Sequence, residues 1–291
     1  MVDLTGEFDR FAMTTTHLPD EQRVTLFEDR IGPIADGFYS RGRKPGEYDE
    51  RVLSSLKSYP ERRADILAVT RTFTAQFASA RRSFEAVFGP VSSDRPVYLL
   101  DSLGELDGGT RQLEGKNTLL FGADVIAEVH GAKDMIPFFH HELFHLYQEK
   151  NLSRCAAIWC ALWEEGMATY VASRLDPGAD DDALILNLPE PIRPGVEADR
   201  SRAVCAVRRL LDSTRDQDYS ALFLGDWQLP GLPSRMGYYI GYLVASDIGR
   251  THDLRAMARM SFVEARPLID ESLQRMAVCD RTSRDRVRQG E

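Results

Sequence analysis

The first ninety residues carry apolar positions with the period of an α-helix. Between Glu61 and Phe88 they recur at three- and four-residue steps, at Ile66, Val69, Phe73, Phe77, Ala80, Phe84 and Val87. This spacing places one apolar stripe along a helix, and Gly89-Pro90 then ends the pattern. The stretch from about Leu18 to Tyr59 is also predicted to be helical, with breaks at Gly32-Pro33 and in the polar run from Arg41 to Gly46.

The pattern changes after residue 95. Val97 to Leu100 and Thr118 to Val129 are rich in apolar and β-branched residues, and the turn-prone segment Gly104 to Gly109 separates them. Such runs predict short strands. Helical periodicity returns after Gly131, in segments near 134–150, 156–175, 200–213, 236–250 and 263–277. Residues 176–200, with four prolines, are expected to form a loop.

These patterns together predict a mostly helical α+β fold. An N-terminal helical region at 1–90 is followed by residues 91–291, in which a small antiparallel or mixed sheet precedes several helices. A chain of 291 residues suits one large domain or two closely packed lobes better than a string of modules. We therefore expect residues 91–291 to form one compact unit.

Composition and charge narrow the classes of partner. The chain is 43% hydrophobic and 28% charged, as globular proteins usually are. Its formal net charge of -9 disfavours nucleic acid, whose non-specific binding depends on clustered Lys and Arg. The C-terminal arginines alternate with acids and are interpreted as a solvated tail: Arg281, Arg284, Arg286 and Arg288, with Asp280, Asp285 and Glu291.

Cysteine usage and apolar runs bear on the cellular compartment. The four cysteines, Cys155, Cys160, Cys205 and Cys279, show neither Cys-x-x-Cys pairing nor the density of a disulfide scaffold, so reduced and mostly buried thiols are expected. Met1 to Arg10 has no signal-like apolar run, and no stretch reaches membrane-spanning length. A cytoplasmic protein without a membrane span is predicted, although a chain from which a signal peptide had been removed would look the same.

One motif carries recognisable chemistry. His141-Glu142-Leu143-Phe144-His145 is a His-Glu-x-x-His sequence within a predicted helix. At 3.6 residues per turn the two histidines lie about 40° apart on one face, so both imidazoles can reach one metal ion. Catalytic zinc takes three protein ligands and a water, and Glu142 is placed to act as general base on that water. The motif therefore predicts a zinc hydrolase that still needs a third ligand.

Glu165 is the preferred third ligand. Nineteen residues separate it from His145, enough for a reversal and a second antiparallel helix. With this spacing, and with Gly166 directly after Glu165, the chain resembles the gluzincin metallopeptidases, in particular their thermolysin-like and zinc-aminopeptidase branches. Glu164 remains an alternative that points about 100° away on a regular helix.

The resemblance implies a zincin-like catalytic core that hydrolyses peptide bonds of a peptide or protein substrate. It also implies a phenol that stabilises the oxyanion, for which Tyr238, in a Tyr-x-x-Gly setting with Gly241, is preferred over Tyr239 and Tyr242. The apolar strand from Asn117 to Val129 resembles the edge strand that these enzymes pair with an extended substrate. The Gly-x-Met-Glu-Asn segment of typical zinc aminopeptidases has no counterpart, which leaves endo- versus exo-action open.

Two other functions fit the same residues: a catalytically silent binding protein on the same scaffold, and a metallohydrolase of non-peptide substrates. Several other polar residues have a structural and a functional interpretation. His130 and His252 could assist substrate or oxyanion binding, and Thr169 could support a metal ligand. His140 and the run Asp180 to Asp182 are interpreted as structural.

Overall fold

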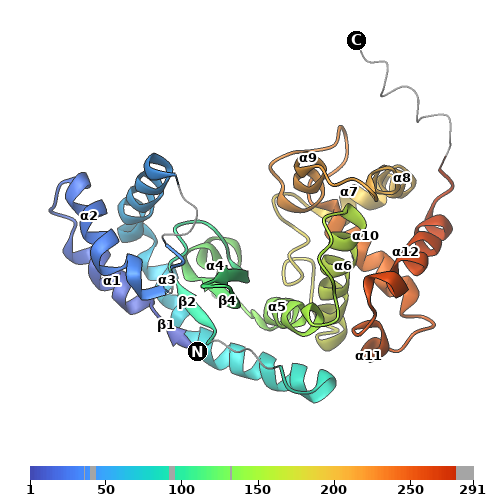
Figure 1. Cartoon of the computed structure of the whole chain (residues 1–291), viewed down its shortest axis with the longest axis horizontal. Coiled ribbons are helices and arrows are strands. Elements are labelled where there is room, and N and C mark those ends of the chain that lie inside the picture. The colour runs from blue at the N-terminus through green and yellow to red at the C-terminus, as the bar shows by residue number, and fades with distance from the viewer. Residues whose placement is uncertain (36, 40–43, 92–95, 132, 280–291) are drawn as a thin grey trace, which may run out of the picture. The chain divides into compact units, whose positions relative to one another are not determined.

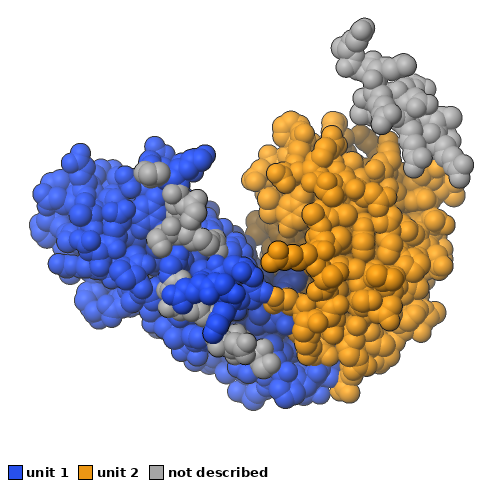
Figure 2. Space-filling model, in the orientation of Figure 1, with its two compact units in different colours: residues 1–146 blue, residues 147–291 orange. Residues whose placement is uncertain are grey.

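The computed structural model describes residues 1–35, 37–39, 44–91, 96–131 and 133–279 (Figure 1). Most of these residues are helical, and a small mixed sheet accompanies the helices, which confirms a predominantly helical α+β fold. The chain divides into two compact units, Met1–Leu146 and Tyr147–Glu291 (Figure 2). The arginine-rich tail from residue 280 and positions 41–43 of the predicted polar break lie outside the described residues.

The first unit contains a helical region over most of its first ninety residues. Its elements are α1 (Thr5–Thr14), α2 (Asp20–Arg30), the 3-10 helix η1 (Gly32–Ala35) and α3 (Pro45–Phe88). Helix α3 ends where the pattern predicted, because Gly89 adopts a φ of 83°, which favours glycine. It runs through Pro60 without stopping. Buried side chains on both sides of that proline, Tyr59 and Ile66 among them, hold the helix in the core.

The same unit contains a four-stranded mixed sheet. Its strands are β1 (Val2–Asp3), β2 (Tyr98–Leu100), β3 (Gly108–Leu113) and β4 (Lys116–Gly122). They lie in the order β1-β2-β4-β3, in which β1, β2 and β4 are parallel and β3 pairs antiparallel to β4. The described sheet therefore has β1 and β3 at its edges.

The predicted edge strand from Asn117 to Val129 is wrong in two respects. Its first part is β4, which lies inside the sheet between β2 and β3. Its second part forms helix α4 (Ala123–Val129). In the first turn of this helix, the buried carboxylate of Asp124 accepts hydrogen bonds from the backbone N–H groups of Ser102 and Gly104, each at 2.7 Å, and these bonds hold the start of α4.

An aromatic cluster fixes the start of helix α5 (Ile136–Glu149) in the first unit. Phe139 of α5 lies 4.9 Å from Phe73 of α3 and 5.4 Å from Phe121 of β4 between ring centroids. Phe138 packs against the same Phe121 ring at 5.7 Å. Edge-to-face contacts of this kind define ring positions as well as burying area. The cluster therefore sets the orientation of the helix that carries the His-Glu-x-x-His motif.

The second unit is built from helices. They are α6 (Ile158–Leu175), α7 (Ile192–Ala198), α8 (Arg200–Leu210), α9 (Asp216–Tyr219), the π-helix η2 (Ser220–Leu224), α10 (Met236–Ile248), α11 (Leu254–Met257) and α12 (Phe262–Met276). The helices expected near 156–175, 200–213, 236–250 and 263–277 are confirmed. Residues 176–200 were expected to form a loop, but they contain helix α7. An ion pair between Arg193 and Asp181, at 2.7 Å, connects α7 to the residues before it.

All four cysteines form disulfides, so the expectation of reduced thiols is wrong. Cys155 pairs with Cys160, and Cys205 of α8 pairs with Cys279 beyond α12. Cysteine spacing does not predict these bonds, because the paired residues are 5 and 74 residues apart and match no spacing motif. Among the described helices, none is both long and apolar enough to cross a membrane.

Candidate metal centre

His141 and His145 converge as their spacing on α5 predicts. Their rings lie 4.7 Å apart between centroids, and the two Nε2 atoms are 3.0 Å apart. Two nitrogens bound to one tetrahedral zinc ion, each at about 2.1 Å, would lie about 3.4 Å from each other. The observed separation is close to that value. Both Nε2 atoms are therefore placed to share a single ion.

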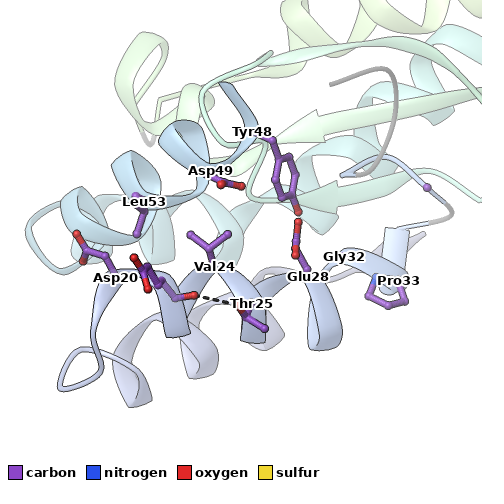
Figure 3. Close-up of a pocket in the computed structure, with 11 residues that line it drawn as sticks. Asp20, Val24, Thr25, Glu28, Gly32, Pro33, Tyr48, Asp49 and Leu53 are labelled. Carbon is purple, nitrogen blue, oxygen red and sulfur yellow. Dashed lines mark hydrogen bonds between the residues drawn. The ribbon is translucent and has the colours of Figure 1, made fainter. Parts of the chain in front are cut away.

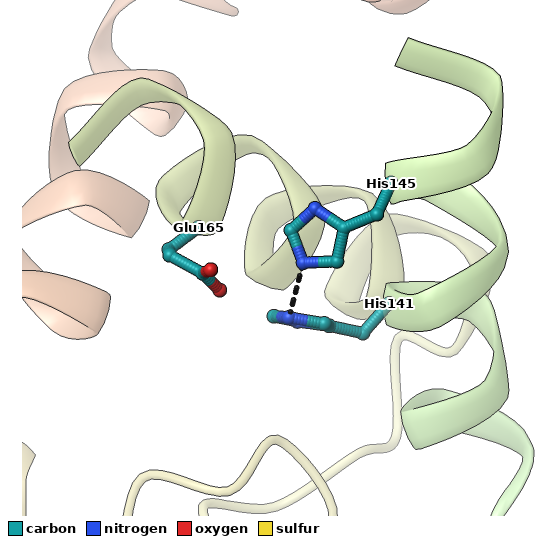
Figure 4. A group of neighbouring side chains, drawn as sticks. All are labelled: His141, His145 and Glu165. Atoms are coloured by element: carbon teal, nitrogen blue, oxygen red, sulfur yellow. Dashed lines mark hydrogen bonds between the residues drawn. The ribbon is translucent and has the colours of Figure 1, made fainter. Parts of the chain in front are cut away.

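Glu165 joins the two histidines. One ligand atom from each of His141, His145 and Glu165 lies within 4.8 Å of the others, and Figure 4 shows the carboxylate opposite the two imidazoles. Two imidazoles and a carboxylate form a donor set that zinc hydrolases use. Among the described residues this is the one such group of His, Cys, Asp and Glu, and it does not include Glu164. The group could hold a metal ion.

Two glycines let the helix of Glu165 approach α10 closely. A Cβ atom on Gly166 would lie 2.3 Å from the backbone carbonyl carbon of Gly241, and a Cβ on Gly241 would lie 2.5 Å from the carbonyl oxygen of Leu162. Neither position has room for a side chain. The glycine after Glu165 and the glycine three residues after Tyr238 are thus packing requirements that bring α6 and α10 into backbone contact.

Tyr238 lies on α10, close enough to Glu165 on α6 for the carboxylate to act on its phenol electrostatically. Burial raises the pKa of the Tyr238 phenol well above its usual range, and the negative charge of Glu165 raises it further. The guanidinium of Arg235 lies over the ring of Tyr238, 4.7 Å from the ring centroid. The phenol therefore remains a protonated hydrogen-bond donor.

The two rival tyrosines are engaged elsewhere. Tyr239 donates a 2.6 Å hydrogen bond to Glu197. Tyr242 stacks on Tyr239 at 6.0 Å and lies below the guanidinium of Arg193 at 5.8 Å. Tyr238 remains the preferred phenol, because the charge of Glu165 acts on its pKa.

Glu142 is 7% exposed on α5 and faces the edge strand β3. A Cβ atom on Gly108 would lie 3.1 Å from Cγ of Glu142 and 2.6 Å from the ring of Phe138, so the backbone at the start of β3 lies directly against the expected base. The sequence interpretation assigned Gly108-Gly109 to a turn and missed this contact. The signal was available, because glycine in a strand often marks a close backbone approach.

The remaining polar candidates have structural partners. His140 is 1% exposed, and its Nε2 lies 2.8 Å from Oγ of Ser83, as expected for a core histidine. His130 Nε2 lies 3.2 Å from Asp107, and His252 contacts the carbonyl of Ile248 in the preceding helix at 3.2 Å. The hydroxyl of Thr169 donates to the backbone carbonyl of Glu165.

The three consecutive aspartates also serve the local fold. Asp180 accepts a hydrogen bond from the N–H of Ala183, Asp181 binds Arg193, and Asp182 accepts from the side chain of Asn187. Each carboxylate is used to close or anchor a turn. The structural interpretation of this run is therefore supported by its contacts.

A surface pocket of about 740 Å³ lies elsewhere in the first unit, between α2, η1 and the start of α3 (Figure 3). Its wall combines apolar Val24 and Leu53 with acidic Glu28 and Asp49. No residue of the metal group or of the predicted catalytic set lines it. The chemistry indicated by the sequence therefore does not map to this pocket.

Comparison with known proteins found no match to this chain among protein families, curated proteins or solved structures.

Proposed function

We propose that this protein is a zinc-dependent hydrolase of peptide bonds. The observation that carries the proposal is the convergence of His141, His145 and Glu165, whose ligand atoms lie within 4.8 Å of one another. The buried Glu142, which follows His141 directly in the chain, and the phenol of Tyr238, on whose pKa the charge of Glu165 acts, would supply the two further groups that amide hydrolysis requires. A gluzincin-type, zincin-like catalytic core is the corresponding proposal for the fold around these residues.

The proposed mechanism assigns a separate task to each group. Zinc bound by the three ligands would lower the pKa of a water molecule to about 7 and polarise the substrate carbonyl. Glu142 accepts the proton of the attacking water and delivers it to the leaving amine. Tyr238 donates a hydrogen bond to the oxyanion that develops on the carbonyl oxygen. Its raised pKa keeps the donated proton on the phenol at neutral pH.

The substrate is proposed to bind as an extended chain along β3. This strand is at one edge of the described sheet, and its first residue, Gly108, touches Glu142. An edge strand offers unpaired backbone N–H and C=O groups to an added strand. A peptide held there would have its backbone close to the general base. We therefore propose that β3, and not the strand from Asn117, pairs with the extended substrate.

Metal content tests the ligand assignment. Protein purified without added metal should contain one zinc per chain, and His141→Ala, His145→Ala and Glu165→Ala should each lose it. Glu164→Ala is the matched control, because it removes the neighbouring carboxylate on the same helix and should retain zinc. Loss of zinc from the Glu164 variant alone would overturn the assignment.

Hydrolysis tests the function separately. Glu142→Gln should keep zinc and abolish cleavage of peptides, because the amide cannot accept the proton of the water. If wild type and Glu142→Gln release equal amounts of product, the chain is a binding protein on this scaffold. A panel of peptide and ester substrates, with and without a chelator, separates a peptidase from a hydrolase of non-peptide substrates.

The two disulfides change the proposed compartment. Disulfides persist in oxidising environments and are rare in the cytosol of mesophiles. We therefore replace the cytoplasmic prediction with maturation in an oxidising compartment. Thiol titration of denatured, unreduced protein tests this and should detect no free thiol, whereas four titratable thiols in protein isolated from its native source would restore the first prediction.

A further inference from the structure

Asp107 holds the chain at the point where the edge strand β3 begins. Its backbone carbonyl accepts a hydrogen bond from the N–H of Gly122 at 2.9 Å, which extends the pairing with β4 by one residue. Its Oδ1 accepts from the N–H of Gly108 at 2.8 Å, and its Oδ2 lies 3.2 Å from Nε2 of His130. The backbone of Gly108 is therefore fixed by a side chain as well as by strand pairing.

His130 supplies the second partner of this carboxylate from a buried position. Its side chain is 8% exposed, directly after helix α4. Burial raises the pKa of Asp107, but the hydrogen bond from His130 and the N–H of Gly108 outweigh burial and lower it. Asp107 is thus ionised at neutral pH and can only accept, so Nε2 of His130 is the donor.

The same histidine also packs on the helix that carries the general base. The ring of His130 lies 4.5 Å from the ring of Phe138 between centroids. Phe138 is one turn before Glu142 on the same face of α5. A Cβ on Gly108 would lie 2.6 Å from the ring of Phe138 and 3.1 Å from Cγ of Glu142. His130 therefore contacts both α5 and, through Asp107, the backbone that packs against Glu142.

Packing alone does not explain a charged pair at this position. Apolar residues of similar volume in place of a buried ion pair are often neutral or stabilising. A hydrogen-bonded pair differs from apolar packing because it defines one geometry. A general base needs such definition, since catalytic groups have to be held within about 0.5 Å of the productive geometry. Here the wall beside Glu142 is the backbone of Gly108, whose N–H the pair holds.

We infer that His130 is a positioning residue for the general base Glu142. Through Asp107 it fixes the backbone of Gly108, and this backbone restricts the side chain of Glu142. The inference rests on the proposed function and adds to it a residue outside the metal group.

Kinetics of three variants test the role of His130. His130→Phe keeps a ring against Phe138 but removes the donor to Asp107, so kcat for a peptide should fall by about 10- to 100-fold. KM and zinc content should stay within about twofold, because no metal ligand is changed. His130→Gln should recover most of kcat, since its amide N–H can replace that of Nε2. His252→Phe is the matched control, because that ring contacts only a carbonyl of α10, and should keep kcat.

Hydrogen exchange at the amide of Gly108 supplies a readout that does not depend on catalysis. Exchange should be faster in His130→Phe than in wild type and close to wild type in His130→Gln. A fall in kcat without faster exchange at Gly108 would reject the inference, because the effect would then not pass through this backbone. Equal losses of kcat in His130→Phe and His130→Gln would also reject it.

The same measurements separate this inference from the proposed function. A wild-type protein that contains zinc and cleaves no peptide would reject the peptidase and the inference together. A wild type that cleaves peptides, with an unchanged kcat in His130→Phe, would keep the peptidase and overturn the inference alone.

Discussion

Gly166 and Gly241 meet backbone to backbone, and a Cβ on Gly241 would lie 2.8 Å from Cα of Gly166. This contact makes two sequence features mutually dependent. Glu165 precedes one glycine, and Tyr238 lies one turn before the other. The close approach of the helices is what allows the carboxylate to act on the pKa of the phenol. Packing and proposed chemistry therefore share the same pair of residues.

Gly166→Ala and Gly241→Ala should each destabilise the fold. The added methyl group would overlap backbone atoms, which cannot move aside as a flexible side chain can, and overpacking of this kind costs about 1–3 kcal/mol or more. Urea unfolding measures the loss. Gly178→Ala is the control, because nothing lies within 4 Å of its added Cβ. A Gly166 variant as stable as the Gly178 variant would mean that the two helices do not pack this closely.

Tyr238→Phe should lower kcat by about 100- to 1000-fold and leave the zinc content unchanged, because one donor to the oxyanion is lost. Tyr239→Phe is the matched control. It removes the hydrogen bond to Glu197 and should cost about 1 kcal/mol of stability without a comparable loss of kcat. Single-turnover rates and metal analysis of both variants decide the assignment. A larger loss of kcat in the Tyr239 variant would transfer the catalytic role to that residue.

Asp101 predicts a pH dependence of stability. Its carboxyl is buried, and its Oδ2 has no hydrogen-bond partner among the residues that the structure describes. Burial raises the pKa of Asp101 well above its usual range, and the charge of Asp124 raises it further. The unfolded chain releases this proton above about pH 3.9, whereas the folded chain retains it. Asp101 therefore lowers the stability progressively as the pH rises from about 4 toward the folded-state pKa.

Asp101→Asn removes that ionisation while it keeps the shape of the side chain. The stability of the variant relative to wild type should increase as the pH is raised from 4.5 to 7.5, measured as the difference between their urea midpoints. Asp49→Asn, at an exposed position, controls for the general loss of one negative charge. Parallel pH profiles of wild type and Asp101→Asn would show that Asp101 is ionised in the folded protein.

Periodicity in the sequence predicted the features that are local. The 3.6-residue repeat is sufficient to place His141 over His145, and the apolar stripe is sufficient to define α3 up to Phe88. Glu165 could be proposed from spacing because only one short connection separates its helix from the motif. These predictions needed no information about distant parts of the chain.

Features that depend on distant contacts were missed. Whether β4 or β3 forms the edge of the sheet is decided by pairing between separate strands, which hydrophobicity along one strand does not encode. Helix α4 depends on the hydrogen bonds from Ser102 and Gly104 to Asp124. The pairing of Cys205 with Cys279 needs α8 and the end of α12 to lie together, which the cysteine spacing alone cannot show.

The two disulfides should differ in their contributions to stability. The bond between Cys205 and Cys279 spans 74 residues, and that between Cys155 and Cys160 spans 5. In the loop-entropy model these separations correspond to about 4 and about 2 kcal/mol, because a longer closed loop removes more freedom from the unfolded chain. The double variant Cys205→Ser with Cys279→Ser should therefore be the less stable of the two double variants in urea.

Reduction supplies the control for this comparison. In the presence of a reductant the wild type should lose stability, and most of the difference in stability between the wild type and the two double variants should disappear. Peptide mapping of unreduced protein should recover the two expected pairs. A larger loss from the Cys155 and Cys160 double variant would show that native packing around that bond, rather than closure of a long loop, sets its contribution.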